Sequence, residues 1–384
     1  MSWRPFLCLL VILSTLGACA NPQPHPSTPT FKATATRLSV TPDPHSSPTV
    51  SPTPPNHPAQ VIPTLTPSAS PTPIELPITT LLFTGNIVPA RCVQAAIDAL
   101  QNYDYPYEEV RQILQAADFA IGTFNATLSS IAPRTGCVPT YILVGDPQNA
   151  DALAKAGFDA MSVATNHIKD CGFTTCGDQA FFETLANFQR VGILTVGAGK
   201  NETEALQPIV LSANGVRFGI VSLGQLEQGG VFAEGQKPGI ARLTDENIQQ
   251  AIQLARQISD VVIFMPHWGP EDQASPTWIQ RQLAQKIVSA GADLVVGNHT
   301  HVVQGYQTLN GVLVFYGLGN FVFDQDLNDH QQGIILLVRY QGSQLLDFEF
   351  IPTHVDEDGR VRLATEAEAK EILQRIEAAS QDLN

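Results

Sequence analysis

Basic residues are scarce in this chain, which has 21 Lys and Arg against 36 Asp and Glu among its 384 residues and a formal net charge of −15. A protein that binds nucleic acid gathers Lys and Arg against the phosphates, so this balance excludes a general nucleic-acid binder. Long apolar runs are also scarce. Outside the N-terminus, no segment is long and apolar enough to span a bilayer. The length allows one large domain or two of ordinary size.

The first 19 residues have the pattern of a targeting segment. Arg4 provides a positive charge, residues 6–16 form a short apolar run, and Leu16-Gly17-Ala18-Cys19 closes it with small residues and a cysteine. This resembles a bacterial lipoprotein signal, which implies cleavage before Cys19 and a lipid on that residue. An ordinary signal peptide with an incidental cysteine, or an uncleaved anchor, is the alternative. The lipoprotein interpretation predicts an extracytoplasmic protein held at the cell membrane by its acyl chains.

Residues 20–75 contain more than half of the 28 prolines, mixed with Ser and Thr. Such a segment has too little apolar surface to offset its ordering entropy, so we expect an extended, disordered tether. The globular part then covers residues 76–384, which is long enough for one substantial core.

Short apolar, β-branched segments alternate with amphipathic segments through this part. Strands are expected at residues 81–84, 118–123, 158–164, 192–196, 209–211, 216–223, 261–265, 294–296, 312–315, 333–340 and 345–351. Helices are expected at residues 107–117, 149–156, 178–190, 244–258 and 365–379, with Thr244 as an N-cap and a further helix-like segment after residue 272. The alternation predicts a layered α/β fold with mixed sheets.

Three of the nine histidines directly follow two of the expected strands. His267 comes after residues 261–265, and His299 and His301 come after residues 294–296. Ligands bind α/β folds in the loops at the carboxyl ends of strands. Residues i and i+2 of an extended backbone point the same way, so His299 and His301 can face one ion. Because imidazole is the commonest ligand of divalent transition metals, the pattern predicts a metal site; satisfied structural histidines are the alternative.

A family resemblance rests on six stretches between residues 81 and 325. In chain order they are TGNIVPAR, AGFDAMSVATNHIKDCG, VGAGKNETEA, PHWGPE, GADLVVGNHTHVVQ and FYGLGNFVFDQ. Together they resemble the bacterial CapA family of capsule or poly-γ-glutamate synthesis proteins, which is related to the calcineurin-like metallophosphatases. The resemblance implies a four-layer α/β/β/α sandwich with a metal site at the strand ends. It also implies a role in making, anchoring or processing a cell-surface polymer.

The resemblance also implies roles for individual residues. Asn166, His267, His299 and His301 match positions that bind metal in metallophosphatases, and the implied cofactor is one or two divalent ions of Mn, Zn or Fe. His167 matches the histidine that stabilises or protonates the leaving group, which makes it the catalytic candidate.

Two positions depart from the family pattern. Asn86 stands where the family usually has an aspartate, and Asn125 stands where it usually has a glutamate. Both remain candidates for the metal site, but a neutral amide offsets the repulsion between two cations poorly. One Asn and three His suit a single Zn²⁺-like ion better than a pair of ions. Three nearby acids are candidate carboxylate ligands, with solvated loop acids as the alternative: Glu271, Asp272 and Asp324.

Four cysteines remain once Cys8 is lost with the signal and Cys19 is lipidated: Cys92, Cys137, Cys171 and Cys176. An even number in an exported domain favours disulfides, and four cysteines allow three pairings. We favour Cys171 with Cys176, which close a short loop, and Cys92 with Cys137. A metal site is the alternative, but CGFTTC lacks the usual spacing and a second close pair.

Two classes of function follow from these features. The first is a metal-dependent hydrolase or transferase acting on a phosphoester, or on an amide of an anionic polymer. The second is a non-catalytic scaffold that binds the polymer or its synthase and export complex. The expected partners are the membrane and an anionic surface polymer, although the acidic chain needs a metal or a local basic site to attract a polyanion. The GAGKN segment lacks the Gly-Lys-Ser/Thr of a phosphate loop, so nucleotide binding is not expected.

Overall fold

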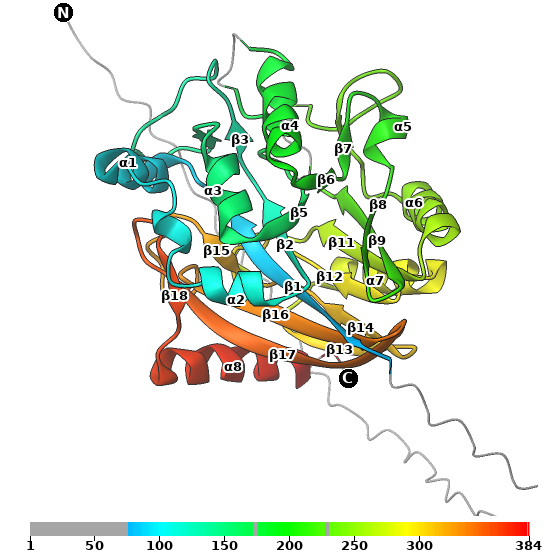
Figure 1. Ribbon diagram of the computed structural model, residues 1–384. Coiled ribbons are helices and arrows are strands. Elements are labelled where there is room, and N and C mark those ends of the chain that lie inside the picture. The colour runs from blue at the N-terminus through cyan, green and yellow to red at the C-terminus, as the bar shows by residue number, and fades with distance from the viewer. Residues whose placement is uncertain (1–75, 172–175, 227–229, 382, 384) are drawn as a thin grey trace, which may run out of the picture. The chain divides into compact units, whose positions relative to one another are not determined.

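The computed structural model describes residues 76–171, 176–226, 230–381 and 383 (Figure 1). The expected signal segment, Cys19 and the expected tether lie outside these residues. By its internal contacts the chain divides into residues 1–71 and 72–384, and the second unit is described below.

Two sheets form the centre of this unit (Figure 1). The larger one has eight strands in the described residues, in the order β18 (Val361–Leu363), β17 (Gln344–Val355), β16 (Gln332–Gln341), β1 (Ile78–Ile87), β2 (Phe119–Phe124), β5 (Phe158–Ser162) and β6 (Leu194–Val196), with β15 (Asn320–Val322) beside β1. The smaller one has six, in the order β13 (Tyr306–Leu309), β14 (Val312–Phe315), β12 (Leu294–Val296), β11 (Val261–His267), β9 (Val216–Gly224) and β8 (Ile209–Ala213). Short pairs are formed by β3 (Thr127–Leu128) with β4 (Val144–Gly145) and by β7 (Ala198–Gly199) with β10 (Gly239–Ile240).

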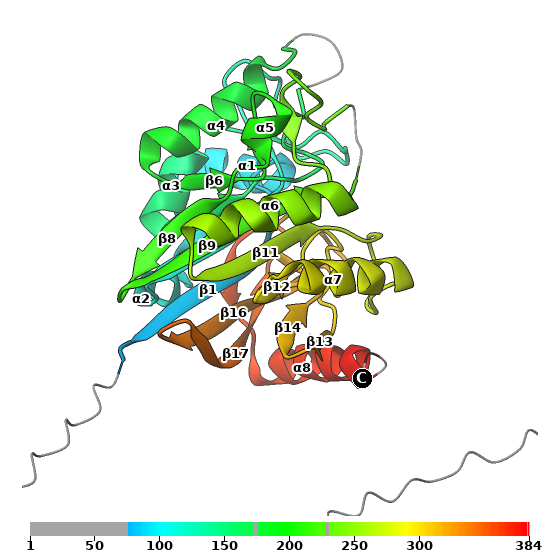
Figure 2. The same cartoon turned by 90° about the vertical axis from the view of Figure 1, so that its right-hand side faces the viewer.

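Helices cover the outer faces of both sheets. The larger sheet carries α1 (Arg91–Leu100), α2 (Arg111–Ala116), α3 (Asn149–Ala156) and α4 (Gln179–Val191). The smaller sheet carries α6 (Asp245–Ile258) and α7 (Trp278–Ala290), which lie in front of it in Figure 2. A short helix, α5 (Glu202–Ala205), packs on β7, and α8 (Glu366–Gln381) contacts β13, β16 and β17. This confirms the four-layer α/β/β/α sandwich. None of the helices in the described part of the chain is both long and apolar enough to cross a membrane.

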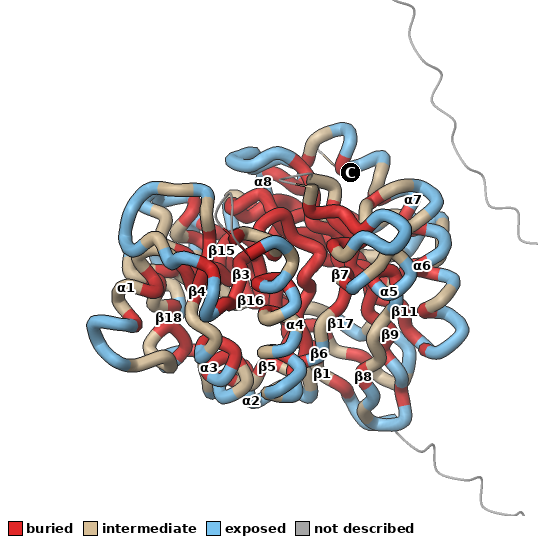
Figure 3. The backbone as a smooth tube through the Cα atoms, turned by 90° about the horizontal axis from the view of Figure 1, so that it is seen from above, coloured by how far each residue is buried: buried red, intermediate tan, exposed pale blue. Residues whose placement is uncertain are grey.

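Strand β11 shows why the central strands read as unbroken apolar runs. Val261, Ile263 and Met265 pack between the two sheets, whereas Val262 and Phe264 pack under α6 and α7. Successive side chains of a strand point to opposite faces, so a strand covered on both faces needs apolar residues at every position. Figure 3 shows the result, with buried backbone in the middle of the domain and exposed loops around it.

The structure corrects two details of the expected elements. Helix α1 was not expected, although its buried Val93 and Ile97 are four residues apart on one face. The expected helix at residues 107–117 is shorter. The backbone N–H of Tyr107 donates to the Asp104 carbonyl, and that of Val110 donates to the Tyr107 carbonyl. These tight turns precede α2, which begins at Arg111. The N-cap is confirmed at Thr244, whose hydroxyl accepts a hydrogen bond from the backbone of Asn247.

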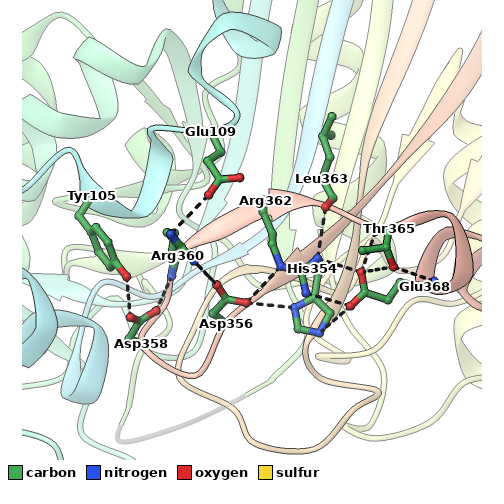
Figure 4. A network of polar contacts seen from close by, with 10 residues as sticks. All are labelled: Tyr105, Glu109, His354, Asp356, Asp358, Arg360, Arg362, Leu363, Thr365 and Glu368. Carbon is green, nitrogen blue, oxygen red and sulfur yellow. Dashed lines mark hydrogen bonds and ion pairs between the residues drawn. The ribbon is translucent and has the colours of Figure 1, made fainter.

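A polar network fixes the C-terminal end of the domain (Figure 4). The two terminal guanidinium nitrogens of Arg362 donate to Glu368, at 2.8 and 2.9 Å. These bonds connect the start of α8 to β18. Asp356 accepts from both Arg360 and Arg362, and the Tyr105 hydroxyl lies 2.6 Å from Asp358. The network therefore joins β18 and α8 to a segment more than two hundred positions earlier in the chain.

Candidate metal centre

The candidate residues gather where parallel strands of the two sheets end. β1, β2 and β5 are neighbouring parallel strands of one sheet, and β11 and β12 are neighbouring parallel strands of the other. The seven predicted site residues lie at or just after these ends, and none is more than 6 % exposed: Asn86, Asn125, Asn166, His167, His267, His299 and His301. Buried polar groups need partners, so their contacts define what the site can bind.

At the centre of this cluster, one possible metal-ligand atom lies close to two others. His267 Nε2 lies 3.0 Å from Asn166 Oδ1 and 3.1 Å from His299 Nδ1. Ligand atoms that sit about 2.1 Å from an ion, at right angles to one another, are themselves about 3 Å apart. The spacing therefore fits an amide oxygen and two imidazole nitrogens around one divalent ion.

The histidine rings are held in the neutral form that binds metal. Burial lowers the pKa of His267 and His299 well below the ordinary value, and neighbouring histidines act in the same direction. Burial also lowers the pKa of His301 to about 4, although its hydrogen bond with Asn320 has the opposite effect. At neutral pH all three rings can bind a cation without first losing a proton.

The ring of His301 is oriented by Asn320, a residue that the sequence interpretation did not select. Asn320 Oδ1 lies 2.9 Å from His301 Nδ1, and Asn320 Nδ2 donates to the main-chain oxygen of His330 at 3.0 Å. The second bond fixes which end of the amide is oxygen, so His301 Nδ1 must carry the proton. His301 Nε2 is consequently the nitrogen with the free lone pair. Asn320 lies within GLGNFVF, one of the stretches that carry the family resemblance.

The catalytic candidate His167 has a similar support. Its Nδ1 lies 2.7 Å from Asp170 Oδ2, and its backbone N–H donates to Asn125 Oδ1 at 3.2 Å. Asp170 holds the imidazole in one orientation and leaves Nε2 as the nitrogen available for proton transfer. Asp170 was also missed, and the only signal was its place three residues after His167.

The backbone at His299 and His301 is not extended, as the sequence interpretation had assumed. His299 and His301 have φ of 107° and 61°, so this segment is a turn and not the extended strand that the i, i+2 argument assumed. The turn brings their ring centroids to 5.9 Å, and the Thr300 hydroxyl donates to the Val302 carbonyl within it. Non-glycine residues at positive φ are uncommon and persist where the surroundings enforce them, often at functional sites.

Asn86 and Asn125 are buried without full hydrogen bonding. Asn86 Oδ1 and Asn125 Nδ2 have no hydrogen-bond partner among the described residues. Neither side chain can neutralise a second cation, so the residues present fit one ion and not two. In the same described ranges, no three His, Cys, Asp or Glu side chains stand together as a ready-made metal site. The amide of Asn166 is therefore needed to complete the donor set.

Of the three candidate acids, Asp324 is occupied by other partners. Arg91 donates through Nε to both of its carboxylate oxygens, at 3.0 and 3.1 Å, and the backbone N–H of Cys92 donates at 2.8 Å. Arg91 also donates to the Thr140 carbonyl at 2.9 Å. Asp324 thus anchors a loop and does not face the histidines.

The other two acids lie side by side on the loop after β11. Asp272 pairs with His330 at 2.7 Å. Glu271 Oε1 lies 3.9 Å from both His299 Nε2 and His301 Nε2. Burial, followed by the charge of Asp272, raises the pKa of Glu271. Glu271 is the acid of the three that faces the histidine cluster.

A cavity of about 570 Å³ opens beside these residues. It is lined by His301 and Glu271 and by the loop that contains Thr140 and Tyr141. The Arg91 bond to Thr140 holds this loop in place, and so does the disulfide described below. Tyr141 is 82 % exposed at the rim, where its ring is free to contact a ligand.

The structure contains both favoured disulfides. Cys92 is bonded to Cys137, which joins the first residues of α1 to the loop that borders the cavity. Cys171 is bonded to Cys176. The CGFTTC segment is thus closed by a disulfide and holds no thiolates for a metal.

Comparisons with known proteins identify a family and several relatives of this chain. Residues 80–325 match the model of a family described as bacterial capsule synthesis protein PGA_cap. The chain is 28 % identical over 276 residues to the PGA biosynthesis protein CapA of Bacillus subtilis, covering 72 % of this chain and 71 % of that protein. It is 27 % identical over 286 residues to the capsule biosynthesis protein CapA of Bacillus anthracis, covering 72 % and 68 %.

Among solved structures, the chain is matched to the NAD nucleotidase NadN of Haemophilus influenzae. The TM-score is 0.45 at 11 % identity, and the match covers 78 % of this chain and 56 % of that one.

Proposed function

The chain belongs to the bacterial capsule synthesis protein family PGA_cap, and from this membership we propose that it takes part in the synthesis of a capsule or poly-γ-glutamate polymer and binds one divalent metal ion. The names of its Bacillus relatives support the first part. The position of His267 Nε2, about 3 Å from both Asn166 Oδ1 and His299 Nδ1, supports the second.

The proposed reaction is hydrolysis or transfer at a phosphoester, or at an amide of an anionic polymer. A bound divalent ion would polarise the reacting group as a Lewis acid. His167, oriented by Asp170, would hold the proton for the leaving group at Nε2. The cavity beside His301 would receive the polymer next to the cluster, with the loop of Tyr141 as one wall.

A non-catalytic scaffold is the second candidate, and a specific observation favours it. Asn86 and Asn125 are wholly buried amides at positions where the family usually has carboxylates. A site that holds at most one ion can bind an anionic polymer without cleaving it. In this version the protein would present the polymer to a synthase or export complex.

The proposed location is the outer side of the cell membrane, with the domain carried by a lipid on Cys19. The support is the Leu16-Gly17-Ala18-Cys19 segment in the sequence. Cys19→Ala should move the protein from the membrane fraction to the soluble fraction of the producing cells. Equal membrane retention of the variant and the unchanged protein would contradict the lipid anchor.

The decisive experiment is elemental mass spectrometry of the purified protein after incubation with Mn²⁺ or Zn²⁺. We expect about one equivalent of metal, and loss of it in the His299→Ala/His301→Ala double variant. His354→Ala is the matched control, because that histidine pairs with Asp356 and Glu368 in the C-terminal network (Figure 4). No metal in the unchanged protein would contradict the metal site and favour the scaffold.

A further inference from the structure

We propose that Glu271 supplies the carboxylate ligand that Asn86 and Asn125 do not provide. This inference rests on the proposed metal function and identifies one more residue of the same site. It would give the ion a charged ligand from the loop after β11, on the opposite sheet from the two asparagines.

Asn320 determines which nitrogen of His301 carries the proton. Asn320 Oδ1 accepts from His301 Nδ1, and the bond from Asn320 Nδ2 to the His330 carbonyl excludes the opposite amide orientation. His301 Nε2 therefore has a lone pair, and it faces Glu271 Oε1 at 3.9 Å. Two acceptors that face each other repel unless a cation lies between them.

The distance between Glu271 and the two histidine rings leaves room for an ion. At 3.9 Å the carboxylate oxygen is too far from either ring nitrogen for a hydrogen bond. An ion with bonds of about 2.0–2.2 Å to Glu271 Oε1 and to His301 Nε2 spans such a gap at an open angle. Because the Glu271 side chain is 45 % exposed, it can change rotamer to reach the ion without disturbing the core. This explains why the acid contributes to the site without forming a ready-made cluster of charged ligands.

Glu271 also lies beside a second ring of the cluster. When His299 Nδ1 faces the ion together with His267, the proton of that ring is on His299 Nε2, which lies 3.9 Å from Glu271 Oε1. One oxygen is thus equidistant from two rings of the cluster. The ligand can approach the ion from the side of the cavity, which Glu271 also lines.

A divalent ion in this cluster needs a negative charge from a neighbouring side chain. The converging donors, an amide and neutral imidazoles, leave a divalent ion uncompensated in a buried site. Asp272 is engaged by His330 and Asp324 by Arg91, and Glu271 forms no ion pair with a lysine or arginine within the described residues. Glu271 is therefore the available negative charge beside the histidines.

The test is the affinity of the full-length purified protein for Zn²⁺, measured by competition with a chromophoric chelator. Glu271→Gln should weaken binding at least about tenfold, the scale of losing a group that supports a metal site. Asp272→Asn is the matched control, because it removes the same charge one residue away and should change the affinity less than about threefold. Glu271→Asp should restore part of the loss, and circular dichroism checks that each variant is folded.

The outcomes separate the two proposals. Unchanged Zn²⁺ affinity in Glu271→Gln, with loss in His301→Ala, overturns the role of Glu271 and leaves the metal function intact. An equal loss in Asp272→Asn also overturns it, because the effect is then a general change of charge. Absence of Zn²⁺ binding in the unchanged protein overturns the metal function itself.

Discussion

Asn125→Asp is the substitution that most directly tests whether a cation occupies this cluster. Asn125 is wholly buried, and its Oδ1 accepts one hydrogen bond, from the backbone N–H of His167 at 3.2 Å. An aspartate has the same shape and keeps that bond. It also replaces a buried amide nitrogen that has no partner among the described residues with a charged oxygen. The change therefore adds one buried negative charge and little else.

The expected loss of stability follows from the new carboxylate having no cationic partner. In a chelating buffer the new carboxylate is a buried, unpaired charge, which costs about 3 kcal/mol of unfolding free energy. For a domain of this size the melting temperature should fall by about 6 °C. With saturating Mn²⁺ or Zn²⁺ the ion compensates the charge, so most of this loss should disappear. Metal binding would then stabilise the folded variant through the carboxylate at residue 125.

The assay is thermal unfolding of both proteins, with EDTA and with metal. Asn149→Asp is the control, because Asn149 is equally buried but donates to Gln94 and the Asp146 carbonyl, remote from the histidines. Its destabilisation should be the same in both buffers. An Asn125→Asp protein with the same loss of stability in EDTA and in metal would refute the reasoning, since no cation would then be near residue 125.

Two further predictions concern the loop beside the cavity and the C-terminal helix. Asp324→Asn breaks a largely buried pair with Arg91, so the free energy of unfolding should fall by about 3 kcal/mol. Proteolysis should become faster at the Thr140 loop, and unchanged cleavage there would contradict the anchoring role. The guanidinium of Arg362 lowers the pKa of Glu368, so this pair stabilises the fold above about pH 4 and is lost as the pH falls further. Glu368→Gln should therefore cost about 1 kcal/mol at pH 7 in urea unfolding and progressively less below pH 4; a constant difference across this range would contradict the linkage.

The sequence predicted the α/β class and most of the elements because their causes are local. Residues 261–265 are apolar at every position, and a strand covered on both faces requires this. Helix α6 begins at its expected N-cap, Thr244, whose hydroxyl bonds to a backbone N–H three residues later. Where the expectation failed, as at residues 107–117, short-range hydrogen bonds and the burial of Tyr107 produced tight turns within an apparently helical pattern.

The sequence by itself also identified the polar residues at the strand ends, since their positions after apolar runs are visible in one dimension. Only the tertiary structure decided which of them meet. His267 and Asn166 are 101 residues apart and come from different sheets, and their contact depends on how the sheets pack. The roles of Asn320 and Glu271 depend on a ring proton and on a 3.9 Å gap. Distances of this kind are set by the folded backbone and leave no periodic trace in the chain.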